Sequence, residues 1–460
     1  MTLNDELFAA LAGAAGGRPI VLVGRLPRSA LKPMEHLERI GAGPFMLLTL
    51  RHGRRAVPPG TTRHVLRPGA AHPDFVIEVA DLERRLRAPD DALRAALDGF
   101  DPCGEAIVIG PNHLDCAGLL GRPRLGGRRS IDLLLEDKTT IDALWAALDL
   151  PHLPSQVVPT TPTALDAASR GLDRGHGVVW AGDNTSAVEG GAIATRWVGD
   201  DATRDHAIAL LRPRCRTARV MPYQVGLPMS MHAWCLARGV AVLSPMEMVV
   251  LRNRHTGAFR FAGCATTWTP PAAAVAQMRD FTNRVARHLQ GERGYRGALS
   301  IDGVLGPDGF VPTELNARFP AGLSRLAHTM DGMPLALADA IIRQGGLADL
   351  SPARLQAVLR AQLARAPIAW LHSATPRAPS MSHGIGLIWG PQGFRRAGPG
   401  EPASNTLDWE AGQVGGALRL RVLAPPRGVT GAALLMGAIR AAGPALAAQF
   451  GSWEPAQTPA

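Results

Sequence analysis

Cysteine is scarce in this chain, and its few copies are not arranged as metal ligands or as disulfide pairs. Cys103, Cys116, Cys215, Cys235 and Cys264 are odd in number, scattered, and never spaced as C-x-x-C. This spacing excludes a disulfide framework and a zinc ribbon as the basis of the fold. We therefore expect a protein of the reducing cytoplasm.

Long apolar runs are also missing. No stretch of 18 apolar residues occurs, and the first residues, MTLNDELFAALAG, carry acids where a secretory signal needs basic charge. The sequence thus predicts a protein that is neither exported nor inserted in a membrane. Its 460 residues, 46% of them hydrophobic, suffice for two or three domains that fold without staples.

The chain is basic but lacks the pattern of a nucleic-acid binder. Its net charge is +10, yet the arginines are spread along the whole length, aromatic residues make up only 5%, and no basic tail exists. Charge of this sign equally favours small anions such as nucleotides, phosphates and carboxylates. We expect no nucleic-acid or membrane partner, and a homo-oligomer stays open.

Lysine is the rarer cation. Of 49 basic residues, only Lys32 and Lys138 are lysine. In a chain that uses arginine almost everywhere, a lysine marks a place that needs a compact ammonium, with survival by chance as the alternative.

An N-terminal α/β domain follows from two short apolar runs. Residues 19–24 (PIVLVG) and 106–110 (AIVIG) are β-branched and end in glycine, which is typical of buried parallel strands. With helical stretches between them, they predict a domain over residues 1–135.

Two further regions follow. Residues 136–347 contain several strand patterns and one long helix near 272–290. Residues 348–460 continue with strand patterns and an alanine-rich helix near 431–449, which predicts a small C-terminal α/β domain.

The strongest signal is a hairpin within residues 298–319, ALSIDGVLGPDGFVPTELNARF. Its turn, GPDG at 306–309, has proline at the second position and glycine where a positive φ is needed. This pattern predicts a three-residue loop closed by a bulge, with Gly306 opposite Phe310.

That register divides the hairpin into a polar and an apolar face. The residues predicted to share the polar face are Ser300, Asp302, Glu314 and Asn316. The residues predicted to point into a core are Leu299, Ile301, Thr313 and Leu315.

The polar face suits a divalent cation. Directly facing Cβ atoms lie roughly 4.5–5.5 Å apart, which is unfavourable for two bare carboxylates but favourable around Mg²⁺. Asp302, Glu314 and Asn316 are the predicted ligands, and Arg318 is placed to meet charge that develops during a transfer reaction. A solvated hairpin face with incidental acids is the alternative.

Asp302 followed by Glu314-x-Asn316-x-Arg318 resembles the metal-binding signature of ATP-grasp ligases, the family that includes D-alanine–D-alanine ligase and glutathione synthetase. The resemblance implies an ATP-grasp core of two α+β subdomains over residues 136–347, preceded by a pre-ATP-grasp domain. It also implies ATP and Mg²⁺ as cofactors.

The resemblance extends along the chain. Asp137-Lys138 resembles the opening of the family's core and implies Lys138 as a phosphate ligand. VVWAGDNTSAVEGG at 178–191 resembles its strand and glycine-rich phosphate loop, which implies Gly190 and Gly191 there. The family's second lysine corresponds to Trp180, so that either Arg196 or another arginine compensates or the nucleotide contacts differ.

A nucleotide-binding linker is implied at residues 220–231, VMPYQVGLPMSM. The residues placed around the base are Met221, Pro222, Tyr223 and Gln224. Pro228 stands where many members have a ribose-binding acid. Arg252 and Arg254 lie where the family places cations for the triphosphate, and Arg254 is carried over as a catalytic residue beside Arg318.

The whole chain most resembles ATP-grasp peptide ligases of the kind found in pheganomycin biosynthesis. The resemblance implies that a nonproteinogenic amino acid is activated as an acyl phosphate and joined to the N-terminal amine of a peptide in antibiotic biosynthesis. The C-terminal domain would cover the acceptor site. The alternatives are an ATP-grasp carboxylase or kinase, and a degenerate module that binds ATP without turnover.

Overall fold

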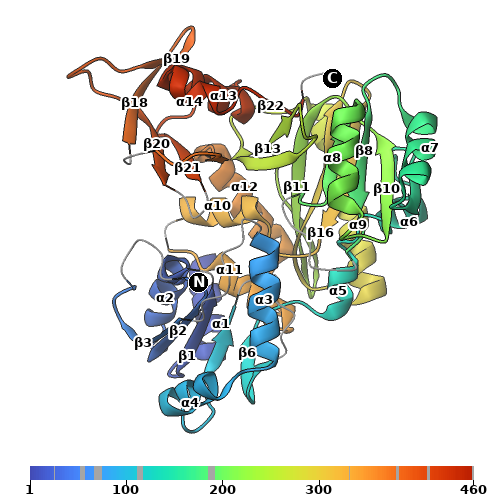
Figure 1. Ribbon diagram of the computed structural model, residues 1–460. Coiled ribbons are helices and arrows are strands. Elements are labelled where there is room, and N and C mark those ends of the chain that lie inside the picture. Colours follow the sequence, from blue (N-terminus) through green and yellow to red (C-terminus); the bar gives the residue numbers. More distant parts are fainter. Residues whose placement is uncertain are drawn as a thin grey trace.

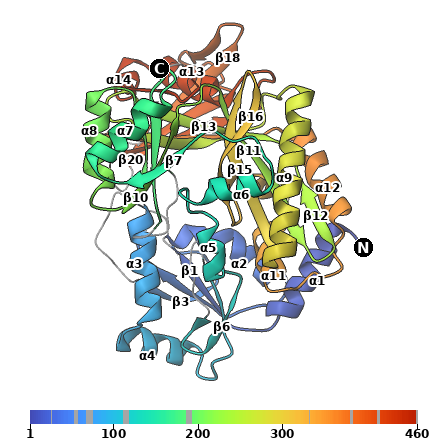
Figure 2. The same cartoon turned by 90° about the vertical axis from the view of Figure 1, so that its right-hand side faces the viewer.

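The computed structural model describes residues 1–24, 26–51, 57–66, 75–110, 118–184, 192–330, 332–379, 383–411 and 415–457. Figures 1 and 2 show an N-terminal part, a central part around a large sheet, and a C-terminal part at the opposite end from the first. None of the helices in these ranges has both the length and the apolarity that a membrane crossing requires.

The N-terminal part is built on a sheet with the order β3-β2-β1-β4-β6-β5, in which only β5 runs antiparallel to its neighbour. The strands are β1 (Ile20–Gly24), β2 (Phe45–Thr49), β3 (Thr61–Leu66), β4 (Ile107–Ile109), β5 (Gly118–Leu119) and β6 (Arg122–Leu125). The helices are α1 (Leu3–Ala15), η1 (Pro27–Ala30), α2 (Leu31–Glu38), α3 (Phe75–Arg87), α4 (Asp91–Phe100) and α5 (Ser130–Leu134).

The two predicted parallel strands are confirmed as β1 and β4, which pair directly. β1 is buried along its whole length because both of its faces are covered. Ile20 and Leu22 enter one apolar core, and Val21 and Val23 enter the core on the opposite face.

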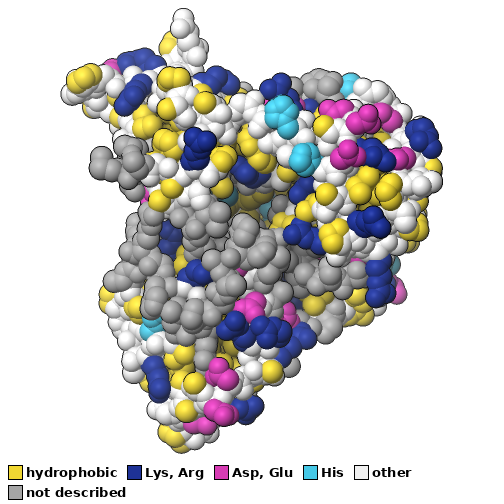
Figure 3. All heavy atoms as spheres, in the orientation of Figure 1, with side chains coloured by type: hydrophobic (Ala, Val, Ile, Leu, Met, Phe, Trp, Pro, Cys, Tyr) yellow, Lys and Arg dark blue, Asp and Glu magenta, His cyan; other side chains and the backbone are white. Residues whose placement is uncertain are grey.

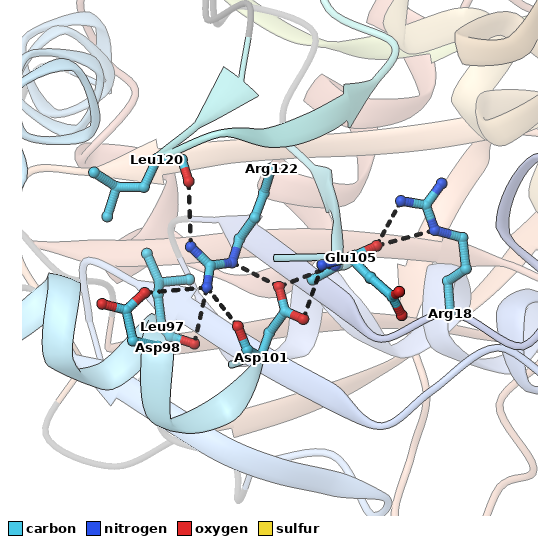
Figure 4. A network of polar contacts seen from close by, with 8 residues as sticks. Arg18, Leu97, Asp98, Asp101, Glu105, Leu120 and Arg122 are labelled. Atoms are coloured by element: carbon cyan, nitrogen blue, oxygen red, sulfur yellow. Dashed lines mark hydrogen bonds and ion pairs between the residues drawn. The ribbon is translucent and has the colours of Figure 1, made fainter. Parts of the chain in front are cut away.

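A buried ion pair holds the edge of this sheet to α4 (Figure 4). Asp101 accepts Nε–H of Arg122 at 2.7 Å and the backbone N–H groups of Glu105 and Ala106, each at 3.0 Å. Arg122 also donates to the carbonyl oxygen of Asp101 at 2.6 Å. Burial would raise the pKa of Asp101, but these hydrogen bonds outweigh it and hold the pKa below its usual value.

The central part begins with α6 (Ile141–Ala147) and a small antiparallel sheet with the order β7-β10-β8-β9. Its strands are β7 (Gln156–Pro159), β8 (Val178–Gly182), β9 (Thr195–Val198) and β10 (Thr217–Pro222). α7 (Pro162–Leu172) and α8 (Asp201–Leu211) supply apolar residues to the core on one face of this sheet.

The large sheet has the order β16-β15-β11-β13-β14-β17-β21-β20-β18-β19, with β12 beside β11 and β22 beside β13. Its strands before residue 320 are β11 (Leu227–Leu236), β12 (Gly239–Val242), β13 (Met246–Asn253), β14 (Phe259–Ala265), β15 (Gly297–Gly306) and β16 (Gly309–Asn316). The helices that accompany it are α9 (Ala272–Arg293), α10 (Ala321–Thr329), α11 (Leu335–Arg343) and α12 (Pro352–Arg365).

β11 was not expected from the sequence, although it lies near the centre of the large sheet. Its first residues fall within the range 220–231 that the sequence assigned to a linker. The strand is buried almost throughout and has apolar cores on both faces, so it lacks the alternation that identifies a half-exposed strand.

The C-terminal part extends the same sheet. Its strands are β17 (Ala369–Thr375), β18 (His383–Gly390), β19 (Gly393–Arg396), β20 (Asn405–Ala411), β21 (Gly416–Val422) and β22 (Trp453–Pro455). Pairing of β14 with β17 crosses the boundary expected near residue 347, while the domain limits themselves stay predictions. The predicted terminal helix is divided at Gly443 into α13 (Gly431–Ala442) and α14 (Pro444–Ala448).

Basic side chains form separate small groups on the face in Figure 3, where acidic and apolar ones lie between them. This distribution agrees with the even spread of arginine along the sequence.

Replacing Asp101 by Asn should destabilise the N-terminal part by about 3 kcal/mol, because Arg122 would then stay buried without its counter-charge. Urea unfolding at pH 7 measures this loss. Asp98→Asn is the matched control, since Asp98 contacts the same guanidinium at 3.2 Å but its side chain is 70% exposed. The pKa of Asp101 is lowered by folding, so its stabilisation is present above its ordinary value of 3.8 and lost as the pH falls further. If the difference in the free energy of unfolding between the parent and Asp101→Asn did not become smaller in acid, this account would be wrong.

Candidate functional site

The β15–β16 hairpin has the predicted facing pairs. Ser300 lies opposite Asn316, and Asp302 lies opposite Glu314. The neighbouring apolar residues Leu299, Ile301 and Leu315 point into the core under α9, as expected.

The turn differs from its prediction. Gly306 pairs with Gly309 rather than with Phe310, which leaves a two-residue loop. Gly309 has a φ of +114°, a conformation that glycine adopts readily. The extra residue is taken up further along, at Thr313, where the pairing shifts by one beside Asp302. Thr313 is therefore a bulge residue, whose hydroxyl donates to the Asp302 carbonyl at 3.2 Å, and not a core residue.

The predicted metal ligands and the predicted lysine meet on the polar face of the hairpin. Asn316 Nδ2 donates to Asp302 Oδ2 at 2.7 Å and lies 3.4 Å from Glu314 Oε1. Lys138 Nζ lies 3.1 Å from Glu314 Oε2. Ser230, on β11, donates to Asp302 Oδ1 at 2.6 Å. We call Asp302, Glu314, Asn316 and Lys138 the hairpin cluster.

The two carboxylates of the cluster differ in acidity. Burial and the nearby Glu314 carboxylate raise the pKa of Asp302 to about 7. Burial would also raise the pKa of Glu314, but the Lys138 ammonium outweighs it and holds that pKa below its usual value. Repulsion between the carboxylates thus favours a proton on Asp302 near neutrality unless another cation relieves it.

Arg318 lies next to the cluster and is held by a carboxylate that sequence reasoning missed. Its guanidinium is ion-paired with Glu136, which also binds Arg128 at 2.6 Å. Burial would lower the pKa of Arg318, but Glu136 outweighs it, so that this pKa is raised and the side chain stays cationic. Glu136 stands two residues before Lys138, so one short segment supplies partners to two sides of the site.

Arg219 joins the small sheet to the hairpin. From β10 it donates to Asp142 of α6 through two bonds of 2.7 and 2.6 Å, and to the Thr313 carbonyl at 3.1 Å. Opposite Arg219 in the sheet lies Ala181. An arginine thus occupies the inter-sheet face of β8 and β10, which the sequence alone did not single out.

Trp180 does not face this gap. It lies in the core beneath α7, and its Nε1–H donates to Ser169 at 2.9 Å. Its neighbour Val179 joins the apolar cluster between the sheets instead. Arg196, which pairs with Trp180, donates to the carbonyls of Ile193 and Thr195. The structure does not bring it to the hairpin cluster.

The linker residues lie at the end of β10. Met221 and Pro222 pair with β8, and Gln224 donates its side chain to the carbonyl of Val225 at 3.2 Å. The Tyr223 amide donates to Gly177 at 3.0 Å, and its hydroxyl donates to the carbonyl of Ala456 near the C-terminal end. Burial raises the pKa of Tyr223 to about 12.

The structure does not bring Arg252 and Arg254 to the hairpin cluster. Arg252 is buried between the rings of Trp197 and Tyr223, at 4.4 and 4.7 Å from their centres, and is ion-paired with Glu454 at 2.5 Å. Arg254 is 57% exposed and donates to the carbonyl of Gly451 at 3.0 Å. These contacts tie both arginines to the C-terminal segment. Gly190 and Gly191 lie outside the described residues.

The donors of the cluster suit a divalent cation that brings phosphate oxygens with it. In the described part of the chain, no group of three His, Cys, Asp or Glu side chains could hold a metal ion. Mg²⁺ commonly takes one or two carboxylates together with substrate phosphates, which Asp302 and Glu314 match. Asn316 now directs its amide nitrogen at both carboxylates, and a half-turn of that amide offers its oxygen instead.

No protein-family model and no curated protein sequence matches the chain, but solved structures do. Biotin carboxylase from Campylobacter jejuni, in complex with β-γ-ATP, is 13% identical, with a TM-score of 0.53 covering 88% of this chain and 87% of that one. The biotin carboxylase domain of Hydrogenobacter thermophilus 2-oxoglutarate carboxylase, in complex with MgADP, ADP and bicarbonate, is 11% identical, with a TM-score of 0.52 covering 95% and 90%. Rhizobium etli pyruvate carboxylase is 15% identical, with a TM-score of 0.53 covering 89% of this chain but 36% of that longer one.

Identities of this size show the fold alone. The chain shares the fold of these structures, and the predicted mixed α/β fold class is confirmed. The closer resemblance to peptide ligases stays a prediction.

Replacing Glu314 by Gln should weaken Mn²⁺ binding at least about tenfold, because one of two carboxylate ligands is lost while the shape is kept. Electron paramagnetic resonance of Mn²⁺, with and without ADP, measures the free ion directly. Asp308→Asn is the control, since Asp308 is an exposed acid at the tip of the same hairpin. Equal Mn²⁺ affinity in parent and Glu314→Gln would remove the metal assignment.

Proposed function

We propose that this protein is an ATP-dependent carboxylate–amine ligase, which activates a carboxylate as an acyl phosphate with release of ADP and then transfers the acyl group to an amine with release of phosphate. The observation that carries the proposal is the hairpin cluster with Arg318 beside it. Asp302, Glu314 and Asn316 offer oxygen ligands, and Lys138 and Arg318 offer fixed cations. This set lies in a chain that shares the fold of structures solved with β-γ-ATP and with MgADP, which supports the resemblance to ATP-grasp ligases.

Each residue has a role that follows from its surroundings. Asp302, Glu314 and Asn316 would hold Mg²⁺, which would neutralise charge on the phosphates of ATP, the donor of the phosphoryl group. Lys138 would turn from Glu314 towards the phosphate oxygens. Arg318, fixed by Glu136, presents its guanidinium to the oxyanion that forms when the amine attacks. Loss of a donor in such a role typically lowers the rate by ~10²–10³.

The finer proposal is peptide bond formation. The activated acid would be a nonproteinogenic amino acid, and the acceptor would be the N-terminal amine of a peptide in natural-product biosynthesis. Two observations support it. The whole chain resembles ATP-grasp peptide ligases, and strands β17 to β21 widen the sheet beyond the core, which gives a long substrate more surface to contact.

The comparisons favour one alternative. The three structures compared above are carboxylases, and one of them contains bicarbonate. An ATP-grasp carboxylase would release ADP with bicarbonate and without an amine.

We expect ADP release from MgATP only when both an acid and an amine are offered, in a panel of amino acids and short peptides tested singly and in pairs. Glu314→Gln should abolish most of this release, whereas Asp308→Asn should retain it. ADP release with bicarbonate alone would favour the carboxylase. ATP binding without turnover across the panel would favour a degenerate module. Full activity of Glu314→Gln would contradict the assignment of the metal site.

A further inference from the structure

A cationic and aromatic surface lies on the C-terminal strands, away from the hairpin cluster. We call it the Trp370 face, and it consists of Phe261 on β14, Trp370 and His372 on β17, Arg419 on β21 and Arg325 on α10. In Figure 1, α10 lies between these strands and the N-terminal part.

The position of this face in the sheet is fixed by alternation along the strands. Leu371 and Leu420 point into the core that α13 covers. Trp370 and His372 flank Leu371 and therefore point to the opposite side. His372 lies directly opposite Arg419 in the pairing of β17 with β21.

The aromatic rings of the face form one packed group. The ring centres of Trp370 and His372 are 4.3 Å apart, and Phe261 lies 6.0 and 5.9 Å from these two rings. The Arg325 guanidinium carbon sits 3.7 Å from the centre of the Trp370 ring. Stacking of this kind fixes the plane of the guanidinium and leaves its edge N–H groups for a partner.

Neither Arg325 nor Arg419 forms an ion pair with any residue that the structure describes. Arg325 Nε and His372 Nε2 are both buried and make no hydrogen bond. Asp408, opposite Arg419, is bound instead by Arg421 at 2.6 Å.

The two arginines also affect the acidity of the histidine beside them. Burial, with smaller contributions from Arg325 and Arg419, lowers the pKa of His372 to about 4. Burial also lowers the pKa of Arg325, with Arg419 and Arg28 of η1 adding to the shift. An anion bound here would relieve the repulsion between Arg325 and Arg419.

The position of the face excludes the reacting carboxylate as that anion. From β15, which carries Asp302, the sheet order passes β11, β13 and β14 before it reaches β17. Four strand spacings of about 4.8 Å make roughly 19 Å along the sheet. An anion at the face therefore belongs to a part of the substrate remote from the transferred phosphoryl group.

We propose that the Trp370 face binds the C-terminal carboxylate of the peptide acceptor, whose N-terminal amine reacts beside the hairpin cluster. This inference rests on the proposed function. An extended peptide rises about 3.3 Å per residue, so a span of roughly 19 Å corresponds to an acceptor of about six residues. Trp370 and Phe261 favour an organic carboxylate carried on a chain over inorganic phosphate, which would gain nothing from the rings.

The experiment compares one hexapeptide as free C-terminal acid and as C-terminal amide, using the sequence that gives the fastest ADP release in the panel. We expect the amide to have a KM about ten- to a hundredfold higher, with little change in kcat, because a charge-assisted bidentate contact is lost. Arg325→Met should raise the KM of the acid towards that of the amide and so abolish the discrimination. Calorimetric titration with both peptides, in the presence of MgADP, gives the same comparison without turnover.

Two further variants distinguish the loss of this contact from a folding defect. Arg325→Lys keeps the charge but loses the planar fork, and we expect it to retain part of the discrimination. Arg427→Met removes an exposed arginine elsewhere in the C-terminal part and should leave the discrimination intact.

The outcomes separate the two proposals. Equal KM values for acid and amide in the parent chain, with ADP release intact, would overturn the inference and leave the proposed function standing. Discrimination that persists in Arg325→Met would also overturn it. Displacement of the acid by millimolar inorganic phosphate, with the amide unaffected, would identify the face as a general anion site and contradict the commitment to a peptide carboxylate. Absence of ADP release with any acid–amine pair would instead reject the proposed function itself.

Discussion

Asp302 and Glu314 face each other on the polar face of the hairpin, and nearby cations and hydrogen-bond donors have to balance the repulsion between their carboxylates. Two unit charges about 4 Å apart repel by roughly 4 kcal/mol at the effective dielectric of a protein surface. Ser230, Asn316 and Lys138 all approach this pair. A slip of one residue in register would turn both acids into the apolar core and their apolar neighbours outward. The register of the hairpin and the positions of the cations therefore depend on each other.

The rest of the site follows from how the cations are held. Glu136 fixes Arg318 and Arg128, while Lys138, two residues further, reaches Glu314. The bridge from Arg219 to Asp142 ties the small sheet to α6, and its third bond reaches the bulge of the hairpin. Acids and bases from three separate segments therefore alternate around the hairpin. The relative position of the two sheets, and not the hairpin alone, determines the geometry of the site.

Local pattern sufficed for part of this arrangement. The apolar runs of β1 and β4 and the facing pairs of the hairpin were predictable, because periodicity and turn residues fix them within a few residues. The facing pairs were predicted correctly although the predicted turn was wrong, because the bulge at Thr313 restores the register beyond it. Sequence analysis did not identify Glu136, Arg219 or β11, because their partners lie far away in sequence. The same applies to Trp180. The sequence placed it in a strand, but the face of the sheet to which its side chain points is known only once the strand pairing is known.

Exposure separates the cations that can meet an incoming anion from those that serve the fold. The side chains of Arg128, Arg219 and Arg252 are at most 1% exposed, and each is already paired with a carboxylate. None of these three guanidinium groups has the surface with which it could contact a phosphate. Lys138 and Arg318 keep 12% and 15% of their side-chain surface. Among these five cations, they alone keep surface that a bound anion can contact, Lys138 by turning from Glu314 and Arg318 while it stays paired with Glu136. One of the chain's two lysines thus stands where a small, reorientable ammonium is needed.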